Sequence, residues 1–283
     1  MTPAPPARPP LVMGVLNVTP DSFSDGGLYD TFERAVARGI AMAEEGADVI
    51  DVGGESSRPG AAPVAGEVEL ARVVPVIEAL AAAPALTERG VRLSVDTVKP
   101  DVAAAAVAAG ATLINDISAS LWEVAAATGA GWVAMHMRGQ PRTMQDDPRY
   151  DDVVAEVKSF VLDRAGLARR AGVAEVWVDP GIGFGKTIDH NLSLLRHLGE
   201  LVEAAAGAGC AGVLVGASRK RFLGLVAAAP KAAAGIVTPA PMEDRVAGSL
   251  ASAAGALVAG AGMVRVHDVA ATVQVARLYG PAA

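Results

Sequence analysis

The chain has 283 residues, of which 52% are hydrophobic and 19% are charged. That composition supports a buried core and excludes a disordered chain. The 24 Lys and Arg residues against 31 Asp and Glu residues give a formal net charge of −7. This charge argues against a generic nucleic-acid-binding protein, which needs a basic surface. An anionic small molecule fits such a chain only if a local basic cluster receives it.

The sequence predicts no targeting segment, no intrachain disulfide and no membrane span. Residues 1–10 are rich in proline and have no apolar leader region, so we expect a disordered tail followed by one domain over residues 11–283. Cys210 is the only cysteine, which excludes an intrachain disulfide. The uncharged stretch 246–264 is rich in Ala, Gly and Ser and predicts a buried helix and strand instead of a membrane span. We therefore expect a cytoplasmic protein.

Short β-rich runs alternate with Ala-rich helical runs along the whole chain. The predicted strands are 11–17, 48–53, 92–96, 112–117, 132–137, 176–179, 213–216 and 264–267. The predicted helices are 32–45, 67–82, 101–109, 121–128, 152–171, 191–206, 245–259 and 271–278.

The strands are apolar at nearly every position, which indicates a parallel sheet covered by helices on both faces. Eight βα units in a chain of this length predict a single-domain (β/α)8 TIM barrel. A doubly wound open sheet is the alternative. Residues 225–241 lack clear periodicity, and we expect them to form an insertion between the seventh strand and its helix.

Nearly every predicted strand ends on a polar or charged residue. These residues are Asn17, Asp51, Asp96, Asn115 with Asp116, His136, Asp179, Ser218 to Lys220, and Arg265 to Asp268. A barrel places such residues together, because its site is built at the carboxyl ends of the strands. Converging carboxylates repel one another unless a ligand or cation compensates them. The ring of polar residues therefore indicates a binding site.

The residue types at this site suit a ligand with two parts. Carboxylates accept hydrogen bonds and Asn both donates and accepts them, which suits a flat 2-amino-pyrimidinone ring with N–H donors. The local basic cluster that an anionic part requires is supplied by Arg58, Lys220, Arg265 and His267.

The glycine-rich run 179–187 does not match either common phosphate-binding motif. A P-loop needs Gly where Pro180 stands, and a dinucleotide-binding fingerprint needs Gly where Lys186 stands. Its glycines instead predict a tight strand-to-helix turn with positive φ angles. We expect Lys186 to be a solvated loop residue and His136 to make no direct contact with a ligand.

Two long loops follow the first and second strands, at residues 17–27 and 53–60. Long loops inside a compact domain are usually either functional lids or disordered. The first loop carries Phe23 among turn-forming residues, where a phenyl ring is not expected to be spare core.

Taken together, these segments resemble the dihydropteroate synthase family of pterin-binding barrels. The matching pieces are residues 13–27, 51–60, 94–97, 114–117, 135–137, 179–186, 218–220 and 265–268. Each piece alone is moderately specific, whereas the full set in this order is highly specific. The resemblance covers essentially the whole chain after the first ten residues.

The resemblance implies a (β/α)8 barrel, a homodimer and a transferase activity. The implied reaction joins 4-aminobenzoate to (7,8-dihydropterin-6-yl)methyl diphosphate, gives 7,8-dihydropteroate for folate biosynthesis and releases pyrophosphate. Mg²⁺ is the implied cofactor, with Asn17 as its protein ligand. The implied catalytic residues are Asp96, Asp179, Lys220 and Arg265.

The resemblance also implies how the substrates are held. The pterin would contact Asp96, Asn115, Met135, Asp179 and Lys220, with Asp51 beside this pocket. The diphosphate would contact Asn17, Arg58, Ser218, Arg265 and His267. The aminobenzoate would contact Phe23, Ser57, Arg58, Pro59, Phe184 and Lys220, and Asp21 would belong to the first loop.

Two other functions use the same kind of pocket. A pterin-binding methyltransferase domain would keep the ring-binding Asp and Asn residues, but it gives no reason for the run Ser57 to Pro59 or for Ser218 to Lys220. A non-catalytic pterin-binding paralogue would be indicated by loss of a loop or of Lys220, and neither is lost.

Overall fold

Eight parallel strands form a closed barrel in which each strand pairs with the next and β8 pairs with β1. The computed structural model describes residues 9–19, 28–56, 60–228 and 238–279. Its strands are β1 (Leu11–Asn17), β2 (Val49–Gly53), β3 (Arg92–Asp96), β4 (Leu113–Asp116), β5 (Gly131–Met135), β6 (Val176–Asp179), β7 (Gly212–Val215) and β8 (Met263–Val266). The predicted (β/α)8 barrel is confirmed, and the open sheet is excluded.

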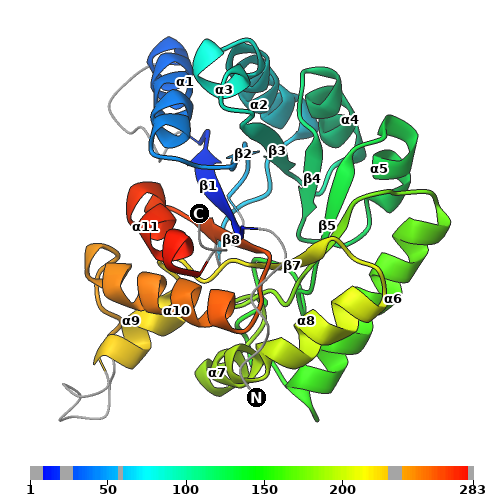
Figure 1. Cartoon of the computed structure of the whole chain (residues 1–283), viewed down its shortest axis with the longest axis vertical. Helices are drawn as coiled ribbons and strands as arrows, with labels where there is room; N and C mark the ends of the chain where they lie inside the picture. Colours follow the sequence, from blue (N-terminus) through cyan, green and yellow to red (C-terminus); the bar gives the residue numbers. More distant parts are fainter. Residues whose placement is uncertain (1–8, 20–27, 57–59, 229–237, 280–283) are drawn as a thin grey trace.

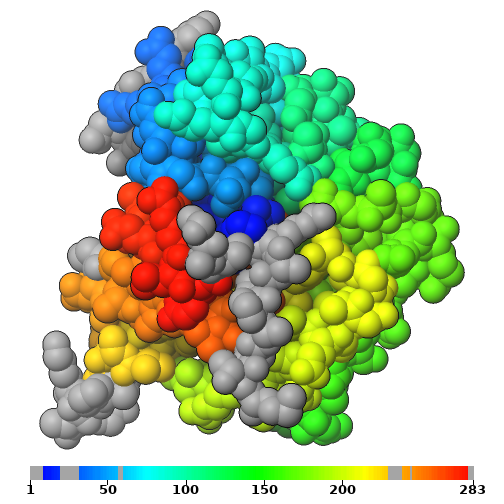
Figure 2. Space-filling view, viewed as in Figure 1, coloured from blue at the N-terminus to red at the C-terminus, as the bar shows by residue number. Residues whose placement is uncertain are grey.

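Helices surround the barrel on all sides (Figure 1). They are α1 (Leu28–Glu44), α2 (Gly66–Ala81), α3 (Pro84–Thr87), α4 (Pro100–Ala108), α5 (Trp122–Thr128), α6 (Val153–Arg170), α7 (Ile188–Arg196), α8 (Leu198–Gly207), α9 (Arg221–Ala228), the 3-10 helix η3 (Glu243–Arg245), α10 (Val246–Val258) and α11 (Val269–Tyr279). Figure 2 shows them as a nearly continuous outer layer, with β1 visible near the middle of this face.

The barrel interior changes from apolar to polar along the strands. The layer nearer the amino ends of the strands is the buried cluster Met13, Val49, Leu113, Val133, Trp177, Leu214 and Met263. Because side chains alternate between the two faces of a strand, the residue two positions later returns to the interior. Those later positions on four strands carry Asp51, Asn115, Asp179 and Arg265. The strand period alone therefore places the predicted polar residues in the upper part of the barrel.

The structure corrects the predicted helix over residues 191–206. That segment forms two helices, α7 and α8, which meet at His197. His197 has φ −104° and ψ 17°, outside helical geometry, and its backbone N–H ends α7 by donating to Ser193 O at 3.0 Å. Helix α7 begins earlier than predicted because Thr187 and His190 form a capping box at its start.

Part of the predicted insertion is helical. Residues 225–228 belong to α9, which begins at Arg221 directly after the seventh strand's loop. Residues 229–237 lie outside the described part of the chain. The short helix α3 was also not predicted, although Pro84 at its first turn is a usual start signal.

The remaining observations concern the N-terminal residues, possible membrane spans and the tryptophans. Residues 1–8 of the predicted tail lie outside the described residues, so that expectation stays a prediction. Within the described residues, no helix combines the length and the apolar character that a membrane crossing requires. Trp132 and Trp177 are buried in the core, and Trp122 packs edge-on against Trp132.

Candidate active site

A cavity of about 640 Å³ opens where the strands end. Seven of the predicted site residues line it, namely Asn17, Asp96, Phe184, Ser218, Lys220, Arg265 and His267. A second cavity of about 270 Å³ adjoins it and shares the lining residues Val15, Asn17, Arg219 and His267. These seven residues therefore meet around one space, whereas Asp51, Asn115, Met135 and Asp179 are not among its lining residues.

Arg265 bridges two carboxylates in the upper barrel. Its Nε donates to Asp51 Oδ2 at 2.6 Å, and its Nη2 donates to Asp96 Oδ2 at 2.7 Å. Asn115 Nδ2 donates to the same oxygen of Asp51 at 2.8 Å. Asp51 is fully buried, and its Oδ1 has no hydrogen-bond partner within the described part of the chain. The cluster thus keeps an unused acceptor next to a buried ion pair.

Burial and charge work against each other in this cluster. Burial raises the pKa of Asp96 to about 7, although the charge of Arg265 acts in the opposite direction. Burial also disfavours charged Arg265, but Asp51 and Asp96 outweigh it and hold the pKa of the guanidinium above its ordinary value. The two carboxylates therefore hold Arg265 in its charged form, whereas burial favours the protonated form of Asp96.

Lys220 lines the cavity beside the loop that follows β6. Its Nζ donates to the carbonyl of Ile182 and lies 4.4 Å from the centroid of the Phe184 ring. Burial lowers the pKa of Lys220 to about 8, and nearby Asp179 opposes that shift. Burial raises the pKa of Asp179, with Lys220 acting against it. A cation, an aromatic ring and a carboxylate therefore share this wall.

The glycine-rich loop between β6 and α7 is a tight turn, as predicted. Gly181, Gly183 and Gly185 have φ angles of +66°, +85° and +61°. A Cβ on Gly181 would lie 1.8 Å from His136 O, and one on Gly185 would lie 2.2 Å from Arg138 O. Only glycine allows this loop to lie directly on the backbone of the segment that follows β5.

Lys186 corrects an expectation, because it is buried and not solvated. Its side chain is 3% exposed, and its Nζ bonds to His136 Nδ1 at 3.0 Å and donates to Phe184 O at 3.0 Å. Burial lowers the pKa of Lys186 to about 7. Burial and the charge of Lys186 lower the pKa of His136 to about 3, so the imidazole is neutral and accepts from the ammonium group. His136 therefore contacts Lys186 and is not among the residues that line the cavity.

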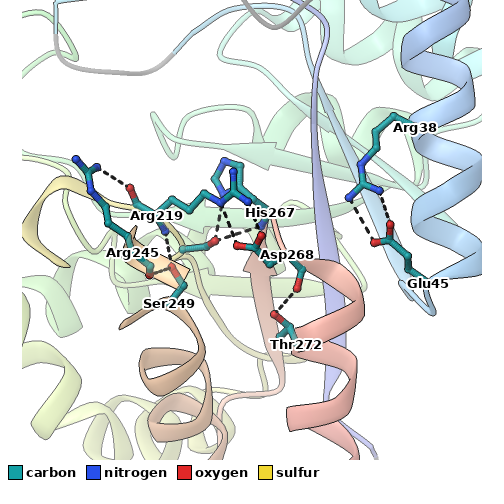
Figure 3. Close-up of polar contacts among 9 residues, drawn as sticks. Arg38, Glu45, Arg219, Arg245, Ser249, His267, Asp268 and Thr272 are labelled. Carbon is teal, nitrogen blue, oxygen red and sulfur yellow. Dashed lines mark hydrogen bonds and ion pairs between the residues drawn. The ribbon is translucent and has the colours of Figure 1, made fainter. Parts of the chain in front are cut away.

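The end of β8 faces the loop that follows β7 (Figure 3). The backbone N–H of His267 donates to Ser218 Oγ at 3.2 Å, and His267 Nδ1 lies 3.1 Å from the same oxygen. Arg219 donates from Nε to Asp268 Oδ2 at 3.0 Å and from Nη2 to the other oxygen. Asn17, Ser218, Arg265 and His267 therefore offer donors to an anion on one side of the cavity.

The remaining predicted residues divide into three groups. Met135 is buried at the end of β5, in register with Asp179. Asp116 is structural, because its carboxylate accepts from Ser118, Ser120, Leu121 and Trp132. Five residues lie outside the described part of the chain, namely Asp21, Phe23, Ser57, Arg58 and Pro59.

Sequence reasoning missed the contribution of the long segment between β5 and α6. Gln145 Nε2 donates to Gly183 O at 2.7 Å, and Tyr150 OH donates to Gly185 O at 2.8 Å. Met144, Gln145 and Pro148 also line the main cavity. The signal was available, because a loop of this length after a barrel strand indicates function.

The described residues contain no group of three or more His, Cys, Asp or Glu side chains arranged to hold a metal ion. Asn17 is the predicted metal ligand, and its side-chain oxygen faces Gly53 near the edge of the cavity. A metal at Asn17 would therefore take most of its ligands from a bound substrate and from water.

Comparisons with known proteins agree with this geometry. Residues 13–267 match the family described as pterin binding enzyme. A dihydropteroate synthase of Escherichia coli is 44% identical, over 95% of this chain and 90% of that protein. A Xanthomonas albilineans dihydropteroate synthase with 4-aminobenzoic acid has a TM-score of 0.82 and 47% identity, over 96% of this chain and 92% of that one.

A second structure extends the comparison to a product. The Xanthomonas albilineans dihydropteroate synthase in complex with 7,8-dihydropteroate has a TM-score of 0.77 and 44% identity, over 95% of this chain and 92% of that one. Identity at this level over nearly complete chains shows more than a shared fold. The chain therefore belongs to the pterin binding enzyme family and, within it, to the dihydropteroate synthases.

Proposed function

We propose that the chain condenses 4-aminobenzoate with (7,8-dihydropterin-6-yl)methyl diphosphate to give 7,8-dihydropteroate and pyrophosphate. The observation that carries this proposal is the single cavity in which Asp96, Lys220 and Arg265 meet. Relatives from Xanthomonas albilineans hold 4-aminobenzoic acid and 7,8-dihydropteroate, which are a substrate and the product of this reaction.

The pterin ring fits the inner part of the cavity. Asp96, Asn115 and Asp179 supply acceptors for its N–H groups, Lys220 supplies a donor, and Met135 and Asp51 lie close to them. Binding at Asp96 requires the carboxylate to be ionised, and burial places its pKa at about 7. The ring-binding set therefore comes from five different strand ends.

The other two parts of the substrates fit the outer cavity. The diphosphate is assigned to Asn17, Arg58, Ser218, Arg265 and His267. The aminobenzoate is assigned to Phe23, Ser57, Arg58, Pro59, Phe184 and Lys220, and Asp21 to the loop beside them. Phe184 and Lys220 already pair on one wall.

The chemistry needs no covalent enzyme intermediate. The bond between the methylene carbon and the diphosphate oxygen breaks, and its electron pair leaves with the diphosphate. Arg265 and His267 stabilise that departing charge, and the ionised carboxylates of Asp96 and Asp179 stabilise the cationic pterin methylene. The amine nitrogen of 4-aminobenzoate then forms the new C–N bond and loses one proton to water. Orientation by Phe184 and Lys220 supplies much of the rate.

Mg²⁺ fits this site as a companion of the diphosphate. The donor set at the cavity edge offers the amide oxygen of Asn17, and Mg²⁺ commonly combines one or two protein oxygens with substrate phosphates and water. When bound there, Mg²⁺ would neutralise charge on the leaving group.

A coupling assay tests the proposal. Purified protein is mixed with labelled 4-aminobenzoate, the pterin diphosphate and Mg²⁺, and both dihydropteroate and pyrophosphate are measured. We expect both products from the wild-type chain, and loss of both in Asp96→Ala and Lys220→Ala with the fold retained by circular dichroism. Absence of both products from the wild-type chain would refute the activity, and wild-type rates in either variant would refute the assigned site.

The homodimer and the cytoplasmic location also stand as proposals, supported by the family to which the chain belongs. Light scattering of the purified protein tests the first, with a mass of twice 28.5 kDa expected. Fractionation of the source cells tests the second, and recovery in the membrane fraction would contradict it.

A further inference from the structure

Arg219 has an unusual backbone conformation at the cavity wall. Its φ angle is +56°, in the left-handed region that non-glycine residues rarely adopt. Among the described residues, Ala119 and Asp147 are the other non-glycine residues with positive φ. Arg219 is distinguished from both because its two chain neighbours, Ser218 and Lys220, line the cavity. Strained residues of this kind persist where the surroundings hold them.

Three separate elements hold Arg219 in this conformation (Figure 3). From α10, Ser249 Oγ accepts from the backbone N–H of Arg219 at 2.9 Å. From η3, Arg245 Nη1 donates to the backbone carbonyl of Arg219 at 3.0 Å. After β8, Asp268 accepts from two nitrogens of the guanidinium group. The backbone donor, the backbone acceptor and the side chain are therefore all fixed.

The turn at Arg219 sends its neighbours to different walls. Ser218 Oγ meets His267 on the anion side of the cavity. Lys220 Nζ reaches the carbonyl of Ile182 and the ring of Phe184 on the other side. A change in the φ angle between these two residues would move both side chains together.

We propose that Arg219 is a positioning residue whose left-handed backbone, held by Asp268, Ser249 and Arg245, sets Ser218 and Lys220 in place for the pterin diphosphate. The inference rests on the proposed function. The competing role is direct binding of the diphosphate by the guanidinium group, because Arg219 lines both cavities. The guanidinium group pairs with Asp268 through Nε and Nη2, so variants of Asp268 distinguish the two roles.

Variants of Asp268 separate the two roles. If Arg219 positions its neighbours, Asp268→Ala loosens the turn and weakens binding of Mg²⁺–pyrophosphate indirectly, by about three- to tenfold, the size of one ordinary hydrogen bond. If Arg219 binds the anion itself, the same change frees its guanidinium group and leaves binding unchanged or tighter. Calorimetry on the intact chain measures this, and unchanged or tighter binding would overturn the proposal.

Variants on α10 test the turn without touching any charge. Ser249→Ala removes the acceptor for the Arg219 N–H, and we expect kcat/KM for the pterin diphosphate to fall about three- to tenfold. Ser252→Ala is the matched control, because Ser252 lies on the same helix and its hydroxyl donates to Gly248 O at 2.8 Å, not to Arg219. Equal effects of the two changes would overturn the proposal.

Substitutions of Arg219 itself test whether its left-handed backbone conformation matters for activity. Arg219→Gly and Arg219→Ala both remove the guanidinium group, but only glycine adopts positive φ without strain. We expect Arg219→Gly to keep a kcat/KM several-fold above that of Arg219→Ala, and equal values would contradict a role for the left-handed turn. Pyrophosphate binding needs no turnover, so a chain that binds the anion as expected but fails to couple would refute the proposed function alone.

Discussion

Lys186 is a cationic side chain in an almost fully buried position, and its partners explain how the fold tolerates it. Its ammonium group bonds to the neutral imidazole of His136 and to the carbonyl of Phe184. Buried charges are tolerated when such acceptors surround them. Because the same bonds join the loop after β6 to the end of β5, the side chain fixes the loop that presents Phe184.

The first prediction concerns substrate selectivity at this residue. Lys186→Met removes the donor that holds Phe184, so we expect the KM for 4-aminobenzoate to rise by about tenfold, with a smaller change for the pterin diphosphate. Steady-state kinetics with each substrate varied in turn measures both constants. Lys158→Met is the control, because Lys158 on α6 makes only a partly exposed ion pair with Glu200 on α8. An equal rise in both constants would count against the assignment.

The second prediction concerns the pH dependence of stability. Burial lowers the pKa of Lys186 from its ordinary 10.5 to about 7. Between these values the unfolded chain binds a proton that the folded chain does not, so this residue makes the unfolding free energy rise with pH. Lys220 acts in the same direction. Denaturant titrations across this range should give a shallower rise for Lys186→Met than for wild type, and identical slopes would contradict the shift.

At the scale of elements, the two loops after β5 and β6 behave as one unit. Backbone contacts at Gly181 and Gly185, and side-chain bonds from Gln145 and Tyr150, join them along their length. Asn191 on α7 adds a bond to the same loop, since its Oδ1 accepts from Gly183 N at 2.6 Å. The wall that carries Phe184 is therefore built from segments far apart in the sequence.

The third prediction tests that contact with a matched pair of glycines. Gly181→Ala places a Cβ 1.8 Å from His136 O at a φ of +66°, so the loops must separate. We expect a loss of more than about 2 kcal/mol of stability together with loss of activity. Gly172→Ala meets nothing within 4 Å at a φ of +96° and should cost about 1 kcal/mol, with activity retained. Thermal unfolding and the coupling assay compare the two, and similar outcomes would contradict the close contact.

At the scale of the whole molecule, ligand binding and stability are divided between the two ends of the barrel. Arg92 at the start of β3 pairs with Glu175 at the start of β6, with distances of 2.8 and 2.7 Å. Trp177 Nε1 also donates to Glu175 at 2.7 Å. These contacts lie at the end opposite the cavity, where residues of such barrels usually serve stability.

The fourth prediction follows from that division. Glu175→Gln weakens the contacts to Arg92 and Trp177, so we expect a loss of about 1–2 kcal/mol in unfolding free energy with an unchanged kcat. Chemical denaturation and steady-state kinetics on the same preparation measure the two quantities. Glu203→Gln, on the exposed face of α8, is the control. A large fall in kcat would show that the two ends are coupled.

The sequence predicted the features that depend on the period of the strands and on the order of strands and helices along the chain. The apolar strands give the barrel, and the period of two places Asp51, Asn115, Asp179 and Arg265 on its inner face. Burial of Lys186 could not be read from its own neighbours, because the partner that receives it stands 50 positions away. The backbone of Arg219 was hidden for the same reason, since its restraints come from residues 26 to 49 positions further along the chain.

The bridge that Arg265 makes between Asp51 and Asp96 has a consequence for selectivity among cations. Carboxylates converging in a closed barrel would otherwise attract divalent ions to the bottom of the cavity. The guanidinium group takes that place and offsets part of the negative charge of the two carboxylates with a cation that belongs to the protein itself. These carboxylates therefore need no metal ion beside them, and the inner pocket is kept clear for an uncharged ring.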